Sequence, residues 1–355
     1  MRNLFLPPVH KAVTGLSRLH LFHPSTTIGV SMRRYILSAA SLLLIGSLAA
    51  IFLAACGTEK KKNQKLYWVQ GLKGHPVHQL TQIAFKEGCA KIGITGEVLG
   101  TDNPDVQGTI ALIEQAMARG DAKGFAIWTG SPAYNPIIEK IGKAGIPVVL
   151  PHFPAAEGSI PGTSGIISCD PADYAREAAR AIGKAIGGKG QVAITQGSFN
   201  TTENLVTETF TKEIQTLHPE IKVLKPEEET FDPSKAIAKA SAILQANPGV
   251  VAALSTTGGG AMTWAGAQRE TGRKLAIIAM DYTRVNLDLV KKGEVLGVIG
   301  QPLWDESFGA AELLAQASGG AKIAWWTKLQ APLITKDNLA PFEAILDKVE
   351  AAIKK

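Results

Sequence analysis

The sequence predicts an α/β protein with two doubly wound parallel-sheet lobes. Short apolar runs alternate with amphipathic segments of helix length, a pattern typical of repeated strand and helix units. Runs such as Phe125 to Trp128 and Leu275 to Met280 are apolar on both faces, as strands covered by helices on both sides must be. About three hundred residues follow the N-terminal leader, and a chain of that length favours two cores over one.

The first element is an export leader that ends at Cys56. Arg33 and Arg34 precede an apolar run from Ile36 to Leu53, and two small alanines then stand before the cysteine. Residues 32–55 therefore resemble a bacterial lipoprotein signal peptide, with Cys56 as the lipidated residue. Met32 directly before the arginines marks residues 1–31 as an upstream extension, or a misassigned start. An uncleaved transmembrane helix is the alternative, because about twenty apolar residues can span a bilayer.

Residues 56–65 are predicted to be a solvated tether between lipid and domain, since they are charged and polar with little to bury. Residues 1–55 carry five of the six net positive charges. Five of the 37 Lys and Arg residues lie in residues 1–55, which contain no acid, so 32 basic side chains face 31 acidic ones in the mature part. A nucleic-acid partner is therefore not expected. For Cys89 and Cys169 we favour free buried thiols over a disulfide.

Ten strands follow in two series. The first series is expected at Leu66–Gln70, Gly96–Gly100, Gly124–Thr129, Pro147–Pro151 and Gly165–Cys169. The second is expected at Gln191–Thr195, Lys222–Leu224, Val250–Ser255, Leu275–Met280 and Val295–Ile299.

The helices between the strands carry start and stop signals. A capping side chain beside a proline precedes three of them: Asp102-Asn103-Pro104 before the helix through Met117, Asp170-Pro171 before Ala172–Ile186, and Asp232-Pro233 before Ser234–Leu244. Glycines that end helices follow at Gly93, Gly120, Gly145 and Gly187-Gly188. Doubly wound units bind ligands at the carboxyl ends of their strands, so the functional residues are expected in those loops.

The loops carry an ordered set of short words. They are Gly145-Ile146-Pro147-Val148-Val149, Gly188-Lys189-Gly190-Gln191-Val192-Ala193, Phe231-Asp232-Pro233, Met280-Asp281 and Gly300-Gln301-Pro302. In this order and spacing they resemble the sugar-binding periplasmic proteins of ABC importers, of the ribose-binding kind with the type I fold. The resemblance runs from Leu66 to about Gly320.

The resemblance implies two lobes joined by a multi-strand hinge. The N-terminal lobe would comprise 66–170 plus 302–325, and the C-terminal lobe 171–301 plus 326–355. It further implies a monomer that closes on a sugar or polyol and then docks on an ABC permease with its cytoplasmic ATPase. A ligand that touches both lobes favours closure only through contacts made in the closed state.

Three site residues are carried over from the resemblance. Asp281 matches the carboxylate that accepts sugar hydroxyls, Gln301 matches a hinge-side amide, and Phe231 matches an aromatic against the sugar ring. A charged acceptor such as Asp281 makes strong hydrogen bonds. The alternatives are that Asp281 caps the helix beginning near Val285 and that Phe231 belongs to the core.

The chain departs from the family at three places. His75-Pro76-Val77-His78 replaces an Asn-Pro-Phe-Phe word, which puts His75 and His78 at the ring-binding wall. Asn204 stands where the family has an arginine, so an anionic ligand becomes less expected. Thr256-Thr257-Gly258-Gly259-Gly260 replaces an Asn-Asp word and lets bare backbone approach the ligand near Thr257.

Loop position alone adds further cleft candidates. They are Asp102, Asn103, Trp128, Thr129, His152, Phe153, Asp170, Phe199, Trp264 and Trp304. Trp128 and Phe153, at strand ends, are the better stacking candidates. Helix capping is the alternative for Asp102 and Asp170, and a core position is the alternative for Trp264.

Other chemistries are not expected. Gly183 to Lys189 superficially fits a phosphate loop but ends a helix, and Gly190 stands where Ser or Thr is needed. A metal held by His75, His78 and His152 lacks acidic or cysteine partners. No nucleophile elbow appears, so neither a cofactor nor catalysis is predicted.

The expected protein is therefore an extracytoplasmic, lipid-anchored solute receptor for a monosaccharide or neutral polyol. The alternatives are a receptor for a furanone, cyclitol or nucleoside in sensing or chemotaxis, and an extracytoplasmic sugar-modifying enzyme. The effector domain of a transcriptional repressor is disfavoured, because a leader occupies the place of its DNA-binding helices.

Overall fold

The computed structural model describes residues 64–74, 76–103, 105–128, 131–155, 158–230 and 232–354. The predictions for residues 1–63, including the signal peptide and Cys56, lie outside these ranges, as do those for His75, Thr129 and Phe231. Among the helices within the described ranges, none combines the length and apolarity needed to cross a membrane.

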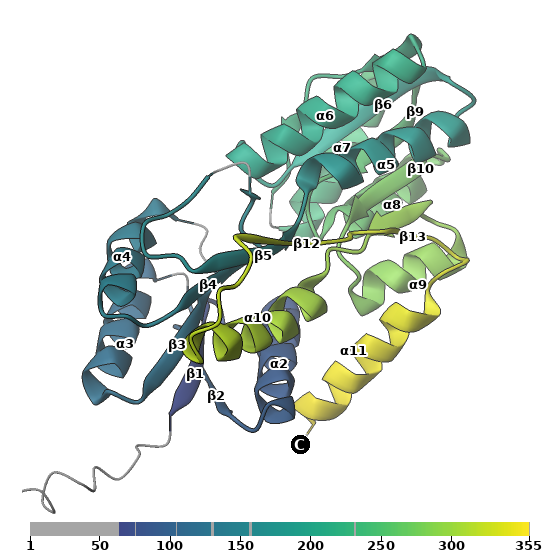
Figure 1. Cartoon of the computed structure of the whole chain (residues 1–355). Helices are drawn as coiled ribbons and strands as arrows, with labels where there is room; N and C mark the ends of the chain where they lie inside the picture. Colours follow the sequence, from purple (N-terminus) through teal and green to yellow (C-terminus); the bar gives the residue numbers. More distant parts are fainter. Residues whose placement is uncertain are drawn as a thin grey trace, which may run out of the picture. The chain divides into compact units, whose positions relative to one another are not determined.

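The first sheet consists of parallel strands with helices on both faces (Figure 1). The strand order is β12-β5-β4-β3-β1-β2. The strands are β1 (Lys65–Val69), β2 (Thr95–Leu99), β3 (Ala122–Ile127), β4 (Val148–Pro151), β5 (Gly165–Cys169) and β12 (Trp326–Leu329). The helices are α2 (Pro76–Lys91), α3 (Val106–Arg119), η1 (Pro132–Tyr134), α4 (Asn135–Lys143) and α10 (Leu303–Ser318).

Alternate residues of β1 explain why both faces of this sheet are covered. Leu66 and Trp68 pack against residues of α2 and α10, such as Phe85 and Ala311. Tyr67 and its neighbours on the opposite face pack against α3 and α4. Both faces are thus buried, which is what an uninterrupted apolar strand requires.

The second sheet repeats this plan in the order β13-β11-β10-β9-β6-β7, with β8 also paired to β6. Its strands are β6 (Lys189–Gln196), β7 (Glu220–Val223), β8 (Glu227–Glu228), β9 (Val250–Ser255), β10 (Ala276–Met280), β11 (Gly297–Ile299) and β13 (Leu333–Ile334). Every pairing is parallel except that of β13 with β11. The helices are α5 (Pro171–Ala185), α6 (Thr201–Leu217), α7 (Pro233–Ala246), α8 (Gly260–Thr271), α9 (Arg284–Lys292) and α11 (Ala340–Ile353). Residues of α5 and α6 join one core cluster, and those of α7, α8 and α9 join another.

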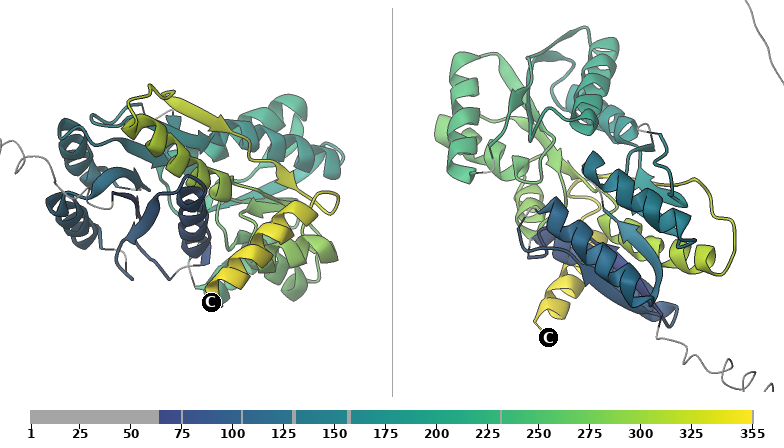
Figure 2. Two further views of the ribbon diagram at one scale, coloured as in Figure 1. Left: turned by 60° about the horizontal axis from the view of Figure 1, so that its bottom comes forward. Right: turned by 90° about the vertical axis from the view of Figure 1, so that its left-hand side faces the viewer.

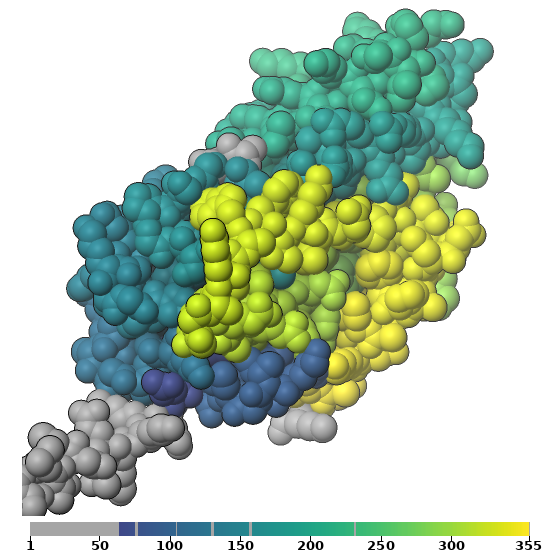
Figure 3. All heavy atoms as spheres, viewed as in Figure 1, coloured from purple at the N-terminus to yellow at the C-terminus, as the bar shows by residue number. Residues whose placement is uncertain are grey.

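Three chain segments connect the two sheets. Asp170 joins β5 to α5, residues 300–302 join β11 to α10, and residues 330–332 join β12 to β13. The last connection is visible in Figure 1 as the yellow chain that runs from β12 in one lobe to β13 in the other, and in Figure 3 as yellow atoms that extend across both lobes. The predicted multi-strand hinge is therefore present, and the two-lobed α/β fold is confirmed.

One predicted lobe boundary needs correction. The sequence places 326–355 in the C-terminal lobe, but Trp326–Leu329 pairs in parallel with Ile166–Cys169 of the first sheet. Backbone hydrogen bonding therefore assigns residues 326–329 to the N-terminal lobe, and the chain crosses only after them.

The predicted strands all occur, each end within two residues of its expected place. Asp170 and Asp232 cap α5 and α7 as predicted. The start of α3 differs, because Asp105 rather than Asp102 accepts the hydrogen bond from the Gly108 amide, at 2.8 Å. Cys89 and Cys169 are free and buried, and burial raises the pKa of both thiols, to about 12 for Cys89.

Candidate functional site

The candidate site joins the carboxyl end of β10 in the C-terminal lobe to the ends of β4 and α10 in the N-terminal lobe. Asp281 follows β10, His152 follows β4, and Glu306 lies in the first turn of α10. The charges of Glu306 and Asp281 raise the pKa of His152, and the charges of His152 and Glu306 act in opposite directions on the pKa of Asp281. The two lobes thus meet at a cluster of two carboxyl groups and one imidazole.

Asp281 has the geometry of a ligand acceptor. Its Oδ1 atom is buried and has no hydrogen-bond partner. Its backbone is left-handed, with a φ of 67°, a conformation that costs energy for residues other than glycine and that clusters at functional sites. Burial raises the pKa of its carboxyl to about 6, with the nearby charge of Glu306 also raising it and His152 opposing.

The capping alternative for Asp281 is wrong, because Thr283 caps α9. The Thr283 hydroxyl accepts a hydrogen bond from the Asn286 amide at 3.2 Å. The Asp281 side chain is therefore not needed to start that helix.

Asn286 fixes the loops on either side of Asp281. Its Nδ2 atom donates to the carbonyl oxygens of Gly258, Met280 and Asp281 at 2.9, 3.1 and 2.9 Å. Gly258 must stay small, because an added Cβ would lie 2.7 Å from Asp281 Oδ2. The glycine-rich loop near Thr257 therefore brings bare backbone to the Asp281 carboxylate, where the sequence predicted close approach to a ligand.

His152 and Glu306 form a hydrogen-bonded pair in the N-terminal lobe, in which the carboxyl group is buried and the imidazole is 25% exposed. His152 Nδ1 lies 3.0 Å from Glu306 Oε2, and the Glu306 side chain is only 1% exposed. Burial lowers the pKa of His152 most strongly, but the charge and hydrogen bond of Glu306 and the charge of Asp281 outweigh it, so the pKa is raised overall. Glu306 Oε1 remains buried without a partner.

Trp128 provides an aromatic wall beside this pair. Its ring lies 4.8 Å from the His152 ring, 5.5 Å from the His78 ring and 6.1 Å from Trp68. An indole face flanked by imidazoles offers both stacking area and hydrogen-bonding edges. Two predicted residues, Trp128 and His78, are thus brought together with His152.

Other predicted contacts are already occupied. Asn204 accepts from Gln196 Nε2 at 3.1 Å and donates to the Phe199 carbonyl at 3.3 Å, so its amide holds the loop before α6. Gln301 lies near the Tyr174 hydroxyl at the hinge: burial raises the pKa of Tyr174 well above its ordinary value, and the Gln301 side chain opposes that rise. Asn204 could reach a ligand only by exchanging one of its two bonds.

Four aromatic and acidic candidates have other surroundings. Phe153 is 7% exposed and packs in the core of the N-terminal lobe, so the stacking role predicted for it is not supported. Asp102 has an 85% exposed side chain and pairs with Lys73 at 3.7 Å, apart from the Asp281 cluster. Asp170 caps α5 by accepting from the Ala172 amide through Oδ1, and its Oδ2 accepts from Lys328 Nζ at 3.3 Å, so both oxygens already have partners. Trp264 is fully buried and donates to Thr195 Oγ1 at 3.0 Å, which confirms a core position.

Sequence reasoning missed three buried polar residues. Glu306 lies on a helix whose buried face only tertiary packing reveals, although an acid in the first turn after a hinge crossing was a usable signal. Gln70 ends β1 with a buried, unpartnered Nε2 atom. Glu229 is 5% exposed and accepts hydrogen bonds from the hydroxyls of Thr195, Ser255 and Thr263.

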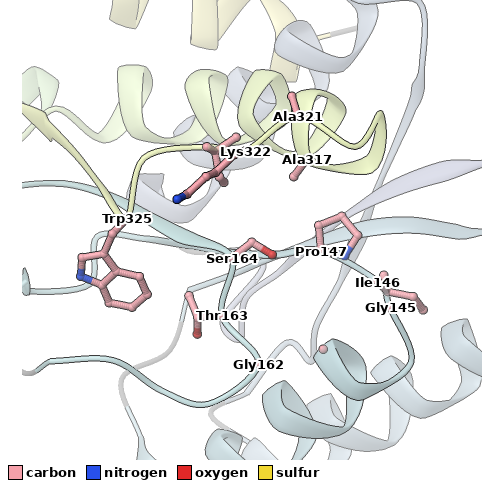
Figure 4. A pocket seen from close by; sticks show the side chains of 12 residues that line it. Gly145, Ile146, Pro147, Gly162, Thr163, Ser164, Ala317, Ala321, Lys322 and Trp325 are labelled. Carbon is pink, nitrogen blue, oxygen red and sulfur yellow. The ribbon is translucent and has the colours of Figure 1, made fainter.

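A separate pocket of about 570 Å³ lies at the amino ends of β4 and β5, whereas the cluster lies at the carboxyl end of β4 (Figure 4). Pro147 and Ser164 line it just before β4 and β5 begin, together with Lys322 and Trp325 after α10. It is therefore distinct from the inter-lobe cluster. Within the described ranges, no three His, Cys, Asp or Glu side chains gather closely enough to hold a metal ion.

Two α/β lobes with three connections and a polar cluster between them define a two-lobed binding protein. The sequence matches the model of the periplasmic binding protein domain family over residues 66–322, and the chain belongs to that family. Membership confirms the prediction of a binding protein rather than an enzyme and implies an extracytoplasmic location.

Solved structures show the same fold. A sugar-binding protein of a sugar ABC transporter from Bacillus halodurans is 20% identical with a TM-score of 0.71, covering 79% of this chain and 100% of its own. An arabinose-binding protein from Geobacillus stearothermophilus is 23% identical with a TM-score of 0.71, covering 79% and 99%. A solute-binding protein from Actinobacillus succinogenes with bound D-allose is 18% identical with a TM-score of 0.71, covering 78% and 99%. A comparison with curated protein sequences found no match.

Proposed function

We propose that the protein is the solute receptor of an ABC importer and binds a monosaccharide or similar neutral polyol between its lobes. The observation that carries this proposal is the buried Asp281 Oδ1, which has no partner and faces charged groups of the other lobe. Buried polar atoms in native proteins nearly always have a hydrogen-bond partner, so an unpartnered acceptor fits a ligand hydroxyl.

The wall opposite Asp281 suits the same ligand. Trp128 offers an apolar face next to His152 and His78, and sugar rings present apolar C–H faces between hydroxyl edges. The family arginine is replaced by Asn204, which removes a cation that would hold an acid. Closure would bring ligand hydroxyls against both lobes at once.

Calorimetry with D-arabinose, D-allose, D-tagatose and myo-inositol tests the proposal, since each is bound in a solved structure of a similar solute-binding protein. We expect at least one to bind the purified protein. Asp281→Ala and Gln301→Ala should each weaken that binding by about tenfold or more, through loss of a hydrogen bond to the ligand. Asp288→Ala, an exposed acid on α9, is the matched control. Near-native affinity in both site variants would remove the site assignment.

We also propose that Cys56 carries the lipid anchor and that the partner is a membrane permease with its ATPase. The support is the apolar run that ends at this cysteine. Expression in a bacterium followed by membrane fractionation tests it: the full chain should fractionate with membranes and Cys56→Ala should not be lipidated. An unmodified Cys56 in the membrane-bound protein would contradict the anchor.

A further inference from the structure

The Glu306 carboxylate is the least expected group in the inter-lobe cluster. It is 1% exposed, and a buried carboxylate is costly unless it is paired and hydrogen-bonded. Its Oε2 atom is satisfied by His152, whereas Oε1 has no partner. Half of this buried carboxylate is therefore available to a ligand.

His152 holds Glu306 in this orientation. The His152 backbone is left-handed, with a φ of 60°, and its ring packs against Trp128 with centroids 4.8 Å apart. A residue held in a strained conformation needs surrounding structure to keep it there. The imidazole is thus fixed on one side by the indole and on the other by the carboxylate.

Glu306 also faces the acceptor of the other lobe. Its charge raises the pKa of Asp281, so the two carboxylates share one region. Among the described residues of this cluster His152 is the basic group, and both carboxylates raise its pKa. An acidic ligand would meet two carboxylates against one imidazole, while a hydroxyl group could donate to either carboxylate.

We propose that Glu306, oriented by His152, is a specificity-determining ligand contact. Its free Oε1 atom accepts a hydrogen bond from a ligand hydroxyl opposite the one bound by Asp281. The site therefore takes a neutral, hydroxyl-rich ligand and rejects the acid derived from it. This inference rests on the proposed function of sugar or polyol binding.

The test compares matched neutral and acidic probes. D-Glucose with D-glucuronate and D-galactose with D-galacturonate are titrated by calorimetry alongside the tightest binder of the neutral panel. We expect the wild type to favour each neutral sugar that binds over its uronate by about a hundredfold or more. Glu306→Gln should weaken binding of the tightest neutral ligand by about tenfold, because it removes a charged acceptor. It should also lower the ratio of neutral-sugar affinity to uronate affinity by about tenfold.

Glu312→Gln on the same helix is the control. Glu312 pairs with Lys91 on the outer surface at 2.9 Å, so its substitution should leave both affinities and their ratio unchanged. Thermal unfolding by circular dichroism checks each variant. If Glu306→Gln does not fold, His152→Asn serves instead, because it removes the group that orients the carboxylate and should narrow the same ratio.

Three outcomes would overturn the inference. One is a folded Glu306→Gln protein whose neutral affinity stays within about twofold of wild type with an unchanged ratio. The second is a wild type that binds a uronate more tightly than its parent sugar. The third is a wild type that binds no probe at all, and this result alone contradicts the proposed function as well.

Discussion

At the scale of single residues, the site contains features that lower the stability of the folded protein. Asp281 combines a left-handed backbone with a buried carboxylate whose Oδ1 has no partner. Each feature destabilises the ligand-free protein, and a bound hydroxyl would relieve the second. We therefore expect substitution of Asp281 to change the stability of the protein and its ligand affinity in opposite directions.

Asp281→Asn should stabilise the ligand-free protein at pH 7.5. The pKa of the folded carboxyl is about 6, above its ordinary 3.8, so the folded state binds the proton more tightly. Stability from this group is then present below pH 3.8 and is lost as the pH rises to about 6, by at most about 3 kcal/mol. Asparagine tolerates the left-handed backbone.

Thermal unfolding at pH 7.5 and pH 3.5 checks this prediction. The variant should melt higher than wild type at pH 7.5, and the difference should shrink at pH 3.5. Because Asn also loses the charged acceptor, its sugar affinity should fall. An equal difference in melting temperature at both pH values would contradict the assigned pKa.

Ligand affinity should weaken in acid for the same reason. A ligand hydroxyl donates to the ionised Asp281, which protonates below about pH 6. The apparent Kd of the tightest sugar of the panel should therefore rise about tenfold between pH 7.5 and pH 5. Calorimetry at the two pH values measures it, and Asp281→Asn should flatten the dependence. If the wild-type affinity stayed the same across this pH range, an ionised Asp281 would be excluded as a ligand contact.

Residues that match a family word were accessible from the sequence, and residues defined by packing were not. Asp281, Gln301 and Trp128 follow strands, where ligand contacts are expected in this fold. Glu306 and Asn286 lie on helices, and their burial depends on which helix face meets the other lobe or loop. Phe153 shows the converse, because a strand-end aromatic turned into the core.

At the scale of elements, α11 links the two lobes beside the hinge. It follows β13 of the C-terminal lobe, and Figure 2 shows it next to α2 of the N-terminal lobe. Lys348 pairs with Glu87 on α2 and lies 4.7 Å from the centre of the Trp304 ring. Arg284 of α9 pairs with Glu350 of α11 at 2.9 Å.

Lys348→Ala should weaken ligand binding modestly, because the pair with Glu87 supports the observed arrangement of the lobes. Both side chains are partly exposed, and such pairs contribute about 1 kcal/mol or less, so a two- to fivefold rise in Kd is expected. Calorimetry measures it, with Lys354→Ala at the exposed end of α11 as control. If Lys348→Ala and Lys354→Ala had the same Kd, the pair between Lys348 and Glu87 would make no contribution to ligand binding.

Element prediction succeeded for long, doubly buried strands and missed the two-residue strands β8 and β13. The apolar runs of β3, β9 and β10 have no other stable place than a covered sheet. By contrast, β8 and β13 span two residues each. Two residues are too few to show the alternation of apolar and polar side chains by which a strand is recognised in a sequence. Their pairing depends on the strands beside them.

At the scale of the whole molecule, three connections would make the proposed closure a hinge motion. Asp170, residues 300–302 and residues 330–332 pass between lobes that have separate sheets. The sequence predicted this arrangement but placed residues 326–329 in the wrong lobe, since four partly exposed residues carry no signal of which sheet edge they extend.

Small-angle scattering should show a smaller radius of gyration with a saturating sugar than without it. Closure depends on contacts made to both lobes together. Asp281→Ala, measured at the same sugar concentration, should keep the ligand-free value. An unchanged radius in a wild type that calorimetry shows to be saturated would mean that the lobes do not move.

The two buried thiols give this molecule an internal reporter. Cys89 lies on α2 with its sulfur against Gly96 of β2, and Cys169 lies beside the first hinge crossing. Burial holds both thiols in the unreactive protonated form. A maleimide dye would therefore label them only where the chain opens around them. The rate of labelling at each cysteine would time the exposure of the domain interior and of the hinge, without any engineered probe.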